Sequence, residues 1–168
     1  RARVRFGDDD VAQGPARPRL MVWIVRAATS ADIEAVRAVA AAAWRDTYDG
    51  LLRAETIEAF LGRAYAPEQV GRRIGSDAFL VAIEGEQVGA FADAREDDEQ
   101  VHLLAIYALP AARGRGAGSA LLAELLGRFR GRPIVAEVLV GNRKGEAFYE
   151  AVKRRGLQNA RNAAILEA

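Results

Sequence analysis

The chain has 168 residues, 51% of them hydrophobic, and a formal net charge of +1. This length favours one domain with a hydrophobic core, and the near-neutral charge indicates neither a nucleic-acid nor an anionic membrane surface. The absence of cysteine excludes disulfides, thiolate metal sites and a cysteine nucleophile, and one histidine excludes a histidine-rich metal site. No apolar run is long enough to span a bilayer and no signal-peptide pattern occurs, so we expect a cytoplasmic protein without a metal.

Residues 1–20 differ from the rest of the chain. They are rich in arginine and include an Asp8-Asp9-Asp10 run and two prolines, and Met21 could be the natural start. We expect a peripheral extension without a catalytic role, followed by a single domain at residues 21–168. The alternative is an arm that packs on the domain or on a second copy in a homodimer.

The first part of the domain is predicted to contain one strand followed by helices. Thr29 or Ser30 can cap the first helix, in which apolar residues recur at helical spacing. The predicted segments are a strand at Val22–Ala27, a helix that begins near Asp32, a connection at Thr47–Leu52, and helices at Glu55–Arg63 and Pro67–Ile74.

Three strands are predicted next. The Glu84-Gly85-Glu86 turn lies between two β-rich runs and is typical of a hairpin. The predicted segments are strands at Ala78–Ile83 and Gln87–Ala92, a charged turn at Arg95–Glu99, and a strand at Val101–Ala108.

A glycine-rich turn at residues 110–119 separates the last of these strands from an amphipathic helix predicted at Ala120–Arg130. Glycines allow close approach of the backbone, and the first amides of a helix lack intrahelical acceptors. The helix dipole and the two arginines of the turn add positive charge. This combination predicts a binding site for phosphate or pyrophosphate.

Two phosphate-binding patterns fit this turn poorly. A P-loop requires a lysine after its last glycine, whereas Ser119 follows Gly118 directly. A dinucleotide-binding G-x-G-x-x-G would begin at Gly114 and Gly116, but Ser119 occupies its third glycine position. Because Glu137 lies near the distance expected for the acid of that motif, the dinucleotide interpretation stays as an alternative.

A second motif follows a predicted strand at Ile134–Val140. Asn142 begins an N-x-x-x-x-x-F-Y-E pattern that ends with Phe148-Tyr149-Glu150, and a helix should begin near the asparagine. Together with the R-x-x-G-x-G pattern of Arg113, Gly116 and Gly118, this pair of motifs resembles the GNAT N-acyltransferase superfamily. The resemblance covers the second half of the chain.

The resemblance implies a fold and an activity. The fold would be α/β (α+β), with a mixed, mostly antiparallel central sheet of about six to seven strands and helices on both faces. The activity would be transfer of an acetyl group from acetyl-CoA to a primary amine of a small molecule or a protein, by direct attack in a ternary complex. The implied carrier-binding residues are Ile106, Ala108, Arg113, Gly114, Arg115, Gly116, Ala117, Gly118, Ser119 and Asn142.

The chemistry needs an acid and a route for a proton. A primary amine with a pKa of about 10.4 must lose a proton, which costs about 4–5 kcal/mol at pH 7. By resemblance, Tyr149 would protonate the leaving thiolate. His102 stands where protein-modifying relatives have a glutamate base, and Asp98 or Glu99 are alternatives.

Residues near the end of the first helix are candidates for the acceptor site. Tyr48 and Asp46 could hold the amine by hydrogen bond and charge, while Trp44 is expected to pack on the core.

The C-terminal segment departs from the family pattern. It lacks the usual Gly-Phe pair after F-Y-E, so the last hairpin is short, missing or completed by a partner chain. A degenerate relative that binds acyl-CoA as a sensor or partner-binding module is therefore the main alternative.

Overall fold

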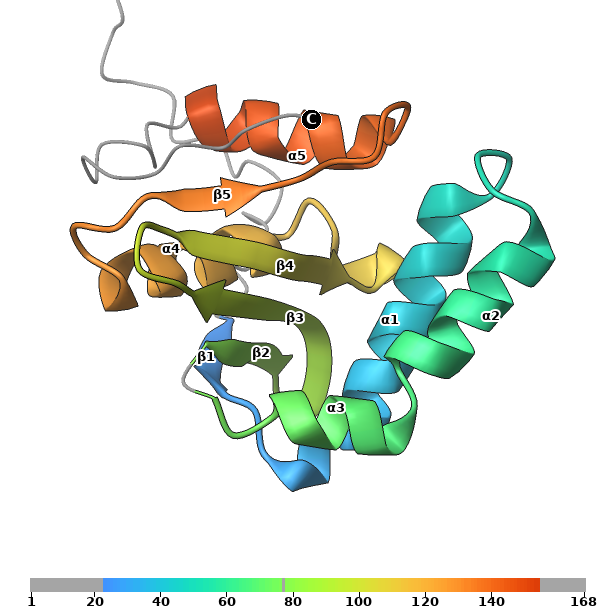
Figure 1. Cartoon of the computed structure of the whole chain (residues 1–168), viewed down its shortest axis with the longest axis horizontal. Coiled ribbons are helices and arrows are strands. Elements are labelled where there is room, and N and C mark those ends of the chain that lie inside the picture. Colours follow the sequence, from blue (N-terminus) through green and yellow to red (C-terminus); the bar gives the residue numbers. More distant parts are fainter. Residues whose placement is uncertain (1–22, 77, 155–168) are drawn as a thin grey trace, which may run out of the picture.

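Five strands form one mixed sheet with helices on both faces in the computed structural model, which describes residues 23–76 and 78–154 (Figure 1). The strand order is β1-β2-β3-β4-β5, in which β1 to β4 are antiparallel and β5 is parallel to β4. The strands are β1 Ile24–Ala27, β2 Phe79–Glu84, β3 Gln87–Glu96, β4 Val101–Ala108 and β5 Ile134–Ala136. The helices are α1 Ile33–Tyr48, α2 Ala54–Ala64, α3 Pro67–Arg73, α4 Ala117–Arg128 and α5 Arg143–Arg154, with 3-10 turns at Ser30–Asp32 and Pro110–Ala112.

The predicted fold class is confirmed, although the described residues hold five strands rather than about six to seven. The predicted N-terminal extension, Val22 and the C-terminal residues 155–168 lie outside the described part of the chain.

Two hydrophobic layers hold the helices on the sheet. On one face, α1, α2 and α3 pack on a layer that contains Phe79 and Phe91, whose rings are stacked at 5.6 Å. On the other face, α4 and α5 pack on a layer that contains Leu80 and Leu121. Because β2 is covered on both sides, its sequence is a continuous apolar run rather than an alternating one.

A bulge in β4 changes the direction of its side chains. Asp93 of β3 pairs with Ala105, whereas the next residue, Ala94, pairs with Leu103, so Leu104 is the extra residue. Val101 and Leu103 consequently face the α4 layer, whereas Ala105 and Tyr107 face the α1 layer.

The partner strand β5 ends early. It pairs only with Val101–Leu103 of β4, so in the described part of the chain the rest of that edge of β4 has no strand partner. β4 and β5 therefore separate beyond Leu103, and their separation creates the space described below.

Several predicted boundaries were wrong, among them the end of β3, which lies at Glu96 and not at Ala92. Thr47 and Tyr48 belong to the last turn of α1 rather than to a connection, since the helix continues to residue 48. The helix after the glycine turn begins at Ala117, not at Ala120, because Gly116 is its N-cap. The strand predicted at Ile134–Val140 ends at Ala136, after which the chain leaves the sheet.

Two other local predictions have clear outcomes. The charged turn is shorter than Arg95–Glu99, because Arg95 and Glu96 extend β3 and pair with His102 and Val101. The capping role of Thr29 is confirmed: Thr29 and Asp32 form a capping box at the 3-10 turn that leads into α1.

Candidate functional site

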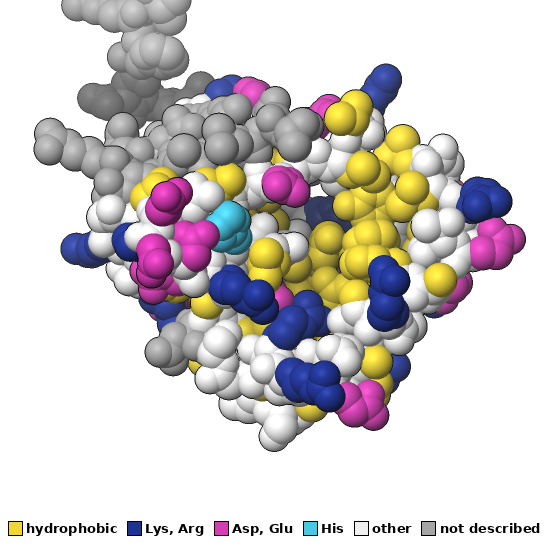
Figure 2. Space-filling view, viewed as in Figure 1, with side chains coloured by type: hydrophobic (Ala, Val, Ile, Leu, Met, Phe, Trp, Pro, Cys, Tyr) yellow, Lys and Arg dark blue, Asp and Glu magenta, His cyan; other side chains and the backbone are white. Residues whose placement is uncertain are grey.

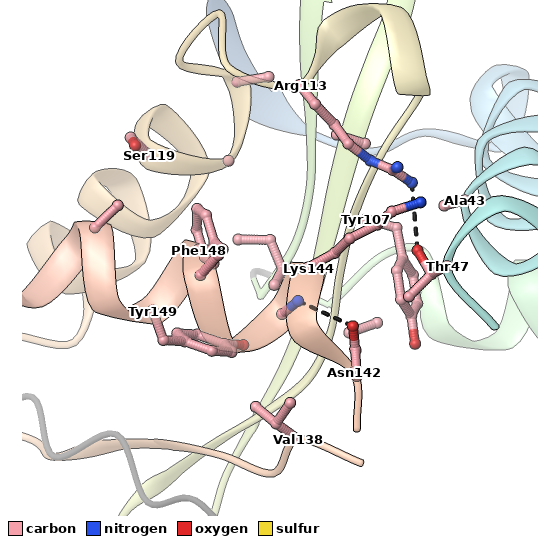
Figure 3. Close-up of a pocket in the computed structure, with 18 of the residues that line it drawn as sticks. Ala43, Thr47, Tyr107, Arg113, Ser119, Val138, Asn142, Lys144, Phe148 and Tyr149 are labelled. Atoms are coloured by element: carbon pink, nitrogen blue, oxygen red, sulfur yellow. Dashed lines mark hydrogen bonds between the residues drawn. The ribbon is translucent and has the colours of Figure 1, made fainter. Parts of the chain in front are cut away.

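The separation of β4 and β5 opens a cavity of about 510 Å³. It is lined by residues 103–108 of β4, by the glycine turn and first turn of α4, by the N-terminal half of α5, and by the end of α1. Figure 3 shows these walls, with Ser119 and Phe148 at one end and Thr47 and Tyr107 at the other. An elongated ligand could thus contact four elements at once.

The glycine turn presents main-chain donors at one end of the cavity. Gly114 and Gly116 have φ of 70° and 93°, a left-handed conformation that other residues rarely adopt. The first helical hydrogen bond of α4 runs from the Ala120 amide to the Gly116 carbonyl (2.9 Å). The amides of residues 117–119 therefore have no acceptor within the helix, as at any helix start, and these residues line the cavity. The arrangement favours an anion.

The first turn of α4 lies directly against α5. A Cβ atom at Gly118 would lie 2.9 Å from Cε2 and 3.2 Å from Cζ of Phe148. Only glycine permits this approach, and both residues line the cavity. Gly118, the second glycine of the R-x-x-G-x-G pattern, thus sets the distance between α4 and α5 at this point of the cavity.

The side chain of Arg115 does not line the cavity, contrary to our expectation that it faces the ligand. Its guanidinium donates to both carboxylate oxygens of Glu84 (2.7 and 2.9 Å) and lies over the ring of Trp23. Trp23 in turn donates from Nε1 to the Arg115 carbonyl (2.8 Å). In this structure the side chain of Arg115 therefore anchors the glycine turn to the sheet.

Three charged side chains meet at the end of α1. The carboxylate of Asp46 accepts from the Arg113 guanidinium and from Lys144 Nζ (2.6 Å), and Lys144 also donates to the Asp46 carbonyl (2.7 Å). Arg113 also donates to Thr47 Oγ1 (3.3 Å), and Figure 3 shows Arg113 and Lys144 pointing toward that residue. The two cations hold the pKa of Asp46 below its usual range. The carboxylate predicted to hold an amine is therefore already neutralised.

Asn142 lies at the start of α5 and lines the cavity. Its Oδ1 accepts from the Gly145 amide (2.9 Å), which caps the helix, and the residue is buried. A Cβ atom at Gly145 would lie 2.8 Å from Asn142 Nδ2, so this side chain is tightly enclosed.

Three tyrosines, Tyr48, Tyr107 and Tyr149, line the cavity. Burial raises the pKa of Tyr149 to about 12. Burial also raises the pKa of Tyr107 and of Tyr48, and for Tyr48 the hydrogen bonds with Tyr107 and Asn142 act in the opposite direction. All three hydroxyls are protonated at neutral pH, and each can donate a proton. Figure 3 shows the Tyr149 hydroxyl directed toward the interior of the cavity.

Sequence reasoning missed Tyr107. Strict alternation along β4 would put Tyr107 on the same face as Val101 and Leu103. The bulge at Leu104 reverses that face and brings Tyr107 beside α1. The local sequence contains no signal for this bulge.

His102 is not among the residues that line the cavity, so the structure does not bring it together with Tyr149. Its Nε2 lies 2.6 Å from Oδ2 of Asp97, in the turn that also contains the predicted alternatives Asp98 and Glu99. The backbone amides of Gln100 and Glu99, with His102, lower the pKa of Asp97 to about 2.

The surface in Figure 2 relates these groups to the cavity. A hollow opens on this face, hydrophobic side chains gather along one side of it, and the histidine side chain lies on the other side. Trp44 packs against the core layer of α1, as expected.

Among residues 23–76 and 78–154, no helix has the length and apolar character needed to cross a membrane. The same residues contain no group of three or more histidine, cysteine, aspartate or glutamate side chains placed to hold a metal ion.

The chain belongs to the acetyltransferase (GNAT) family, whose pattern matches residues 36–153. No curated protein sequence is significantly similar to it. Among solved structures, the PaiA N-acetyltransferase of Thermoplasma acidophilum, determined with coenzyme A, is 25% identical with a TM-score of 0.72, over 78% of this chain and 88% of the other.

Two further structures share the fold at lower identity. A GNAT family acetyltransferase of Brucella melitensis, determined with acetyl-CoA, is 23% identical with a TM-score of 0.53, over 81% of this chain and 82% of the other. AAC(6')-Iy, determined with the bisubstrate analogue CoA-S-monomethyl-acetylneamine, is 18% identical with a TM-score of 0.51, over 78% of this chain and 89% of the other.

Proposed function

We propose that this protein is an N-acyltransferase that moves the acetyl group of acetyl-CoA to a primary amine. The observation that carries the proposal is the cavity bounded by β4, the start of α4 and α5, which has open helix amides at one end and three tyrosine phenols in its lining. Structures of the family that contain coenzyme A or acetyl-CoA support the choice of carrier.

The anionic end of the carrier would lie at the glycine turn. The amides of residues 114–119 would receive the pyrophosphate, with Arg113 as a charged partner. The exposed edge of β4 at Ile106 and Ala108 would bind the pantetheine arm through main-chain groups, as an added strand does. Asn142 lines the wall that faces this arm.

In the proposed reaction the amine nitrogen attacks the thioester carbonyl. A carbon–nitrogen bond forms, the carbon–sulfur bond breaks, and the thiolate of CoA leaves. Tyr149 donates its proton to the sulfur and regains one as the nitrogen of the new amide loses its surplus proton. The raised pKa of Tyr149 keeps the phenol protonated at neutral pH. No enzyme nucleophile is needed, in keeping with a chain that has no cysteine.

The proton of the ammonium form must leave before attack. We propose that His102 receives it through water, because its ring is exposed, contacts the ionised carboxylate of Asp97 and does not line the cavity itself. A His102→Gln variant should have a lower kcat than the parent and an altered pH–rate profile. An unchanged profile would remove His102 from the mechanism.

The first experiment is a thermal-shift measurement with acetyl-CoA, CoA and NAD, followed by an amine panel with detection of the free thiol. We expect stabilisation by acetyl-CoA and CoA, none by NAD, and thiol release that depends on the amine. Stabilisation without turnover on any amine would favour the sensor alternative, and stabilisation by NAD alone would favour the dinucleotide alternative.

The role of Tyr149 is tested with a matched pair of phenol deletions. Tyr149→Phe should lower kcat by about 10²-fold or more with little change in the affinity for acetyl-CoA. Tyr65→Phe removes a phenol that is equally buried, and whose pKa is also raised to about 12, but that does not line the cavity. Equal losses in the two variants would show that Tyr149 is not the acid.

A further inference from the structure

Four aromatic rings connect the surface of the molecule with the phenol end of the cavity. Phe60 of α2 stacks on Trp44 of α1 at 4.0 Å with an interplanar angle of 20°. Trp44 lies 4.4 Å from the ring of Tyr48 and 6.2 Å from that of Tyr107. We call these four residues the aromatic wall.

Two residues of the aromatic wall line the cavity and the other two pack beside them. Phe60 and Trp44 are only half-buried, whereas Tyr48 and Tyr107 line the cavity. Figure 2 shows hydrophobic side chains gathered along one side of the hollow in this face. A molecule that lay on Phe60 and Trp44 could therefore extend a short chain toward Tyr48 and Tyr107.

The charges around the wall do not suit a polycation. Glu137 is the one carboxylate among the residues that line the cavity, against the cations Arg113 and Lys144. The carboxylate of Asp46 is held by both of these cations, and that of Glu58, on α2 beside Phe60, is paired with Arg45 (2.7 Å). Within the cavity, a ligand with several ammonium groups would meet one carboxylate and two cations.

Aromatic side chains suit a different amine. Ring faces attract one ammonium group before it loses its proton, and they stack with other rings. We propose, on the basis of the proposed function, that the acceptor is a monoamine carried by an aromatic group, an arylalkylamine. Its ring lies on Phe60 and Trp44, and its nitrogen enters the cavity beside Tyr48 and Tyr107. The nitrogen forms the amide bond with the acetyl carbon, CoA leaves as the thiol, and the ammonium proton passes through water to His102.

The test compares amines of similar length. We expect kcat/KM for phenethylamine to exceed that for 2-cyclohexylethylamine and hexylamine by about 3–10-fold, the range of aromatic pair energies. We expect a larger advantage over spermidine and over a lysine-containing peptide. A preference for spermidine or the peptide would overturn the aromatic-acceptor proposal while leaving the acetyltransferase intact. If no amine releases thiol although acetyl-CoA binds, both proposals fail.

A variant at Phe60 tests whether the preference for an aromatic amine depends on the aromatic wall. Phe60→Leu should raise KM for phenethylamine by about 3–10-fold, leave KM for acetyl-CoA unchanged and affect hexylamine little. Phe129→Leu is the matched control, because Phe129 is also half-buried but packs in the α4 layer. If Phe60→Leu unfolds, Phe60→Met serves instead, since it keeps apolar volume without a ring. An equal loss for phenethylamine and hexylamine would overturn the proposal.

Discussion

Two glycines of α4 should respond in opposite directions to the same substitution. Gly127 has no heavy atom within 4 Å of the position of an added Cβ, whereas at Gly118 that atom would lie 2.9 Å from Phe148. Alanine in place of a helical glycine stabilises by about 0.5–1 kcal/mol through lower backbone entropy. Overpacking costs about 1–3 kcal/mol, so Gly118→Ala should have a net cost of up to about 2 kcal/mol.

The assay is thermal unfolding of both variants, with and without acetyl-CoA. Gly127→Ala should raise Tm by about 2–4 °C per kcal/mol gained, and Gly118→Ala should lower it. Gly118→Ala should also weaken acetyl-CoA binding, because Phe148 must move into or away from the cavity that it lines. Equal increases in Tm for the two variants would refute the claim that α4 and α5 touch at Gly118.

Other predictions concern charged groups. Arg73→Met should lower the free energy of unfolding by about 2–4 kcal/mol in urea titrations, because it leaves the buried carboxylate of Asp93, 3.1 Å away, without its partner. Adding Asp93→Asn should restore most of this loss. Burial raises the pKa of Asp93, so the folded protein binds this proton more tightly than the unfolded chain. The contribution of Asp93 to the free energy of unfolding therefore falls as the pH rises from the pKa of this group in the unfolded chain through its raised pKa in the folded protein. The free energy of unfolding of the parent minus that of Asp93→Asn should be greater at pH 4 than at pH 7. A difference that does not change with pH would contradict the raised pKa of Asp93. Asp46→Asn removes the anion held by Arg113 and Lys144, and isothermal titration should show acetyl-CoA binding tightened by less than about fivefold. Weaker binding of acetyl-CoA to Asp46→Asn would mean that Asp46 orients these two cations rather than competes with acetyl-CoA for them.

The features of the site that depend on residues close together in the sequence could be predicted. The strand before the glycine turn was predicted with its observed bounds, Val101–Ala108, because a β-rich run is followed directly by turn residues. The left-handed conformations of Gly114 and Gly116 follow from the glycines themselves.

The parts that depend on distant contacts could not be predicted. Arg115 and Glu84 are 31 positions apart, and Lys144 and Asp46 are 98 apart, so local pattern contains no information about either pair. The same holds for Tyr107, whose direction depends on the register between β3 and β4 rather than on its neighbours in sequence. Long-range pairing thus decided which charged and aromatic side chains reach the cavity.

The early end of β5 has an evolutionary consequence. Beyond Leu103, β4 offers its backbone to a ligand, and most substitutions leave a backbone group in place. The aromatic side chains of α1 and α2 have no such protection, since one base change can replace a ring. If the proposed function holds, a lineage that keeps this sheet can therefore retain its acyl donor while substitutions of the aromatic side chains change the acceptor amine.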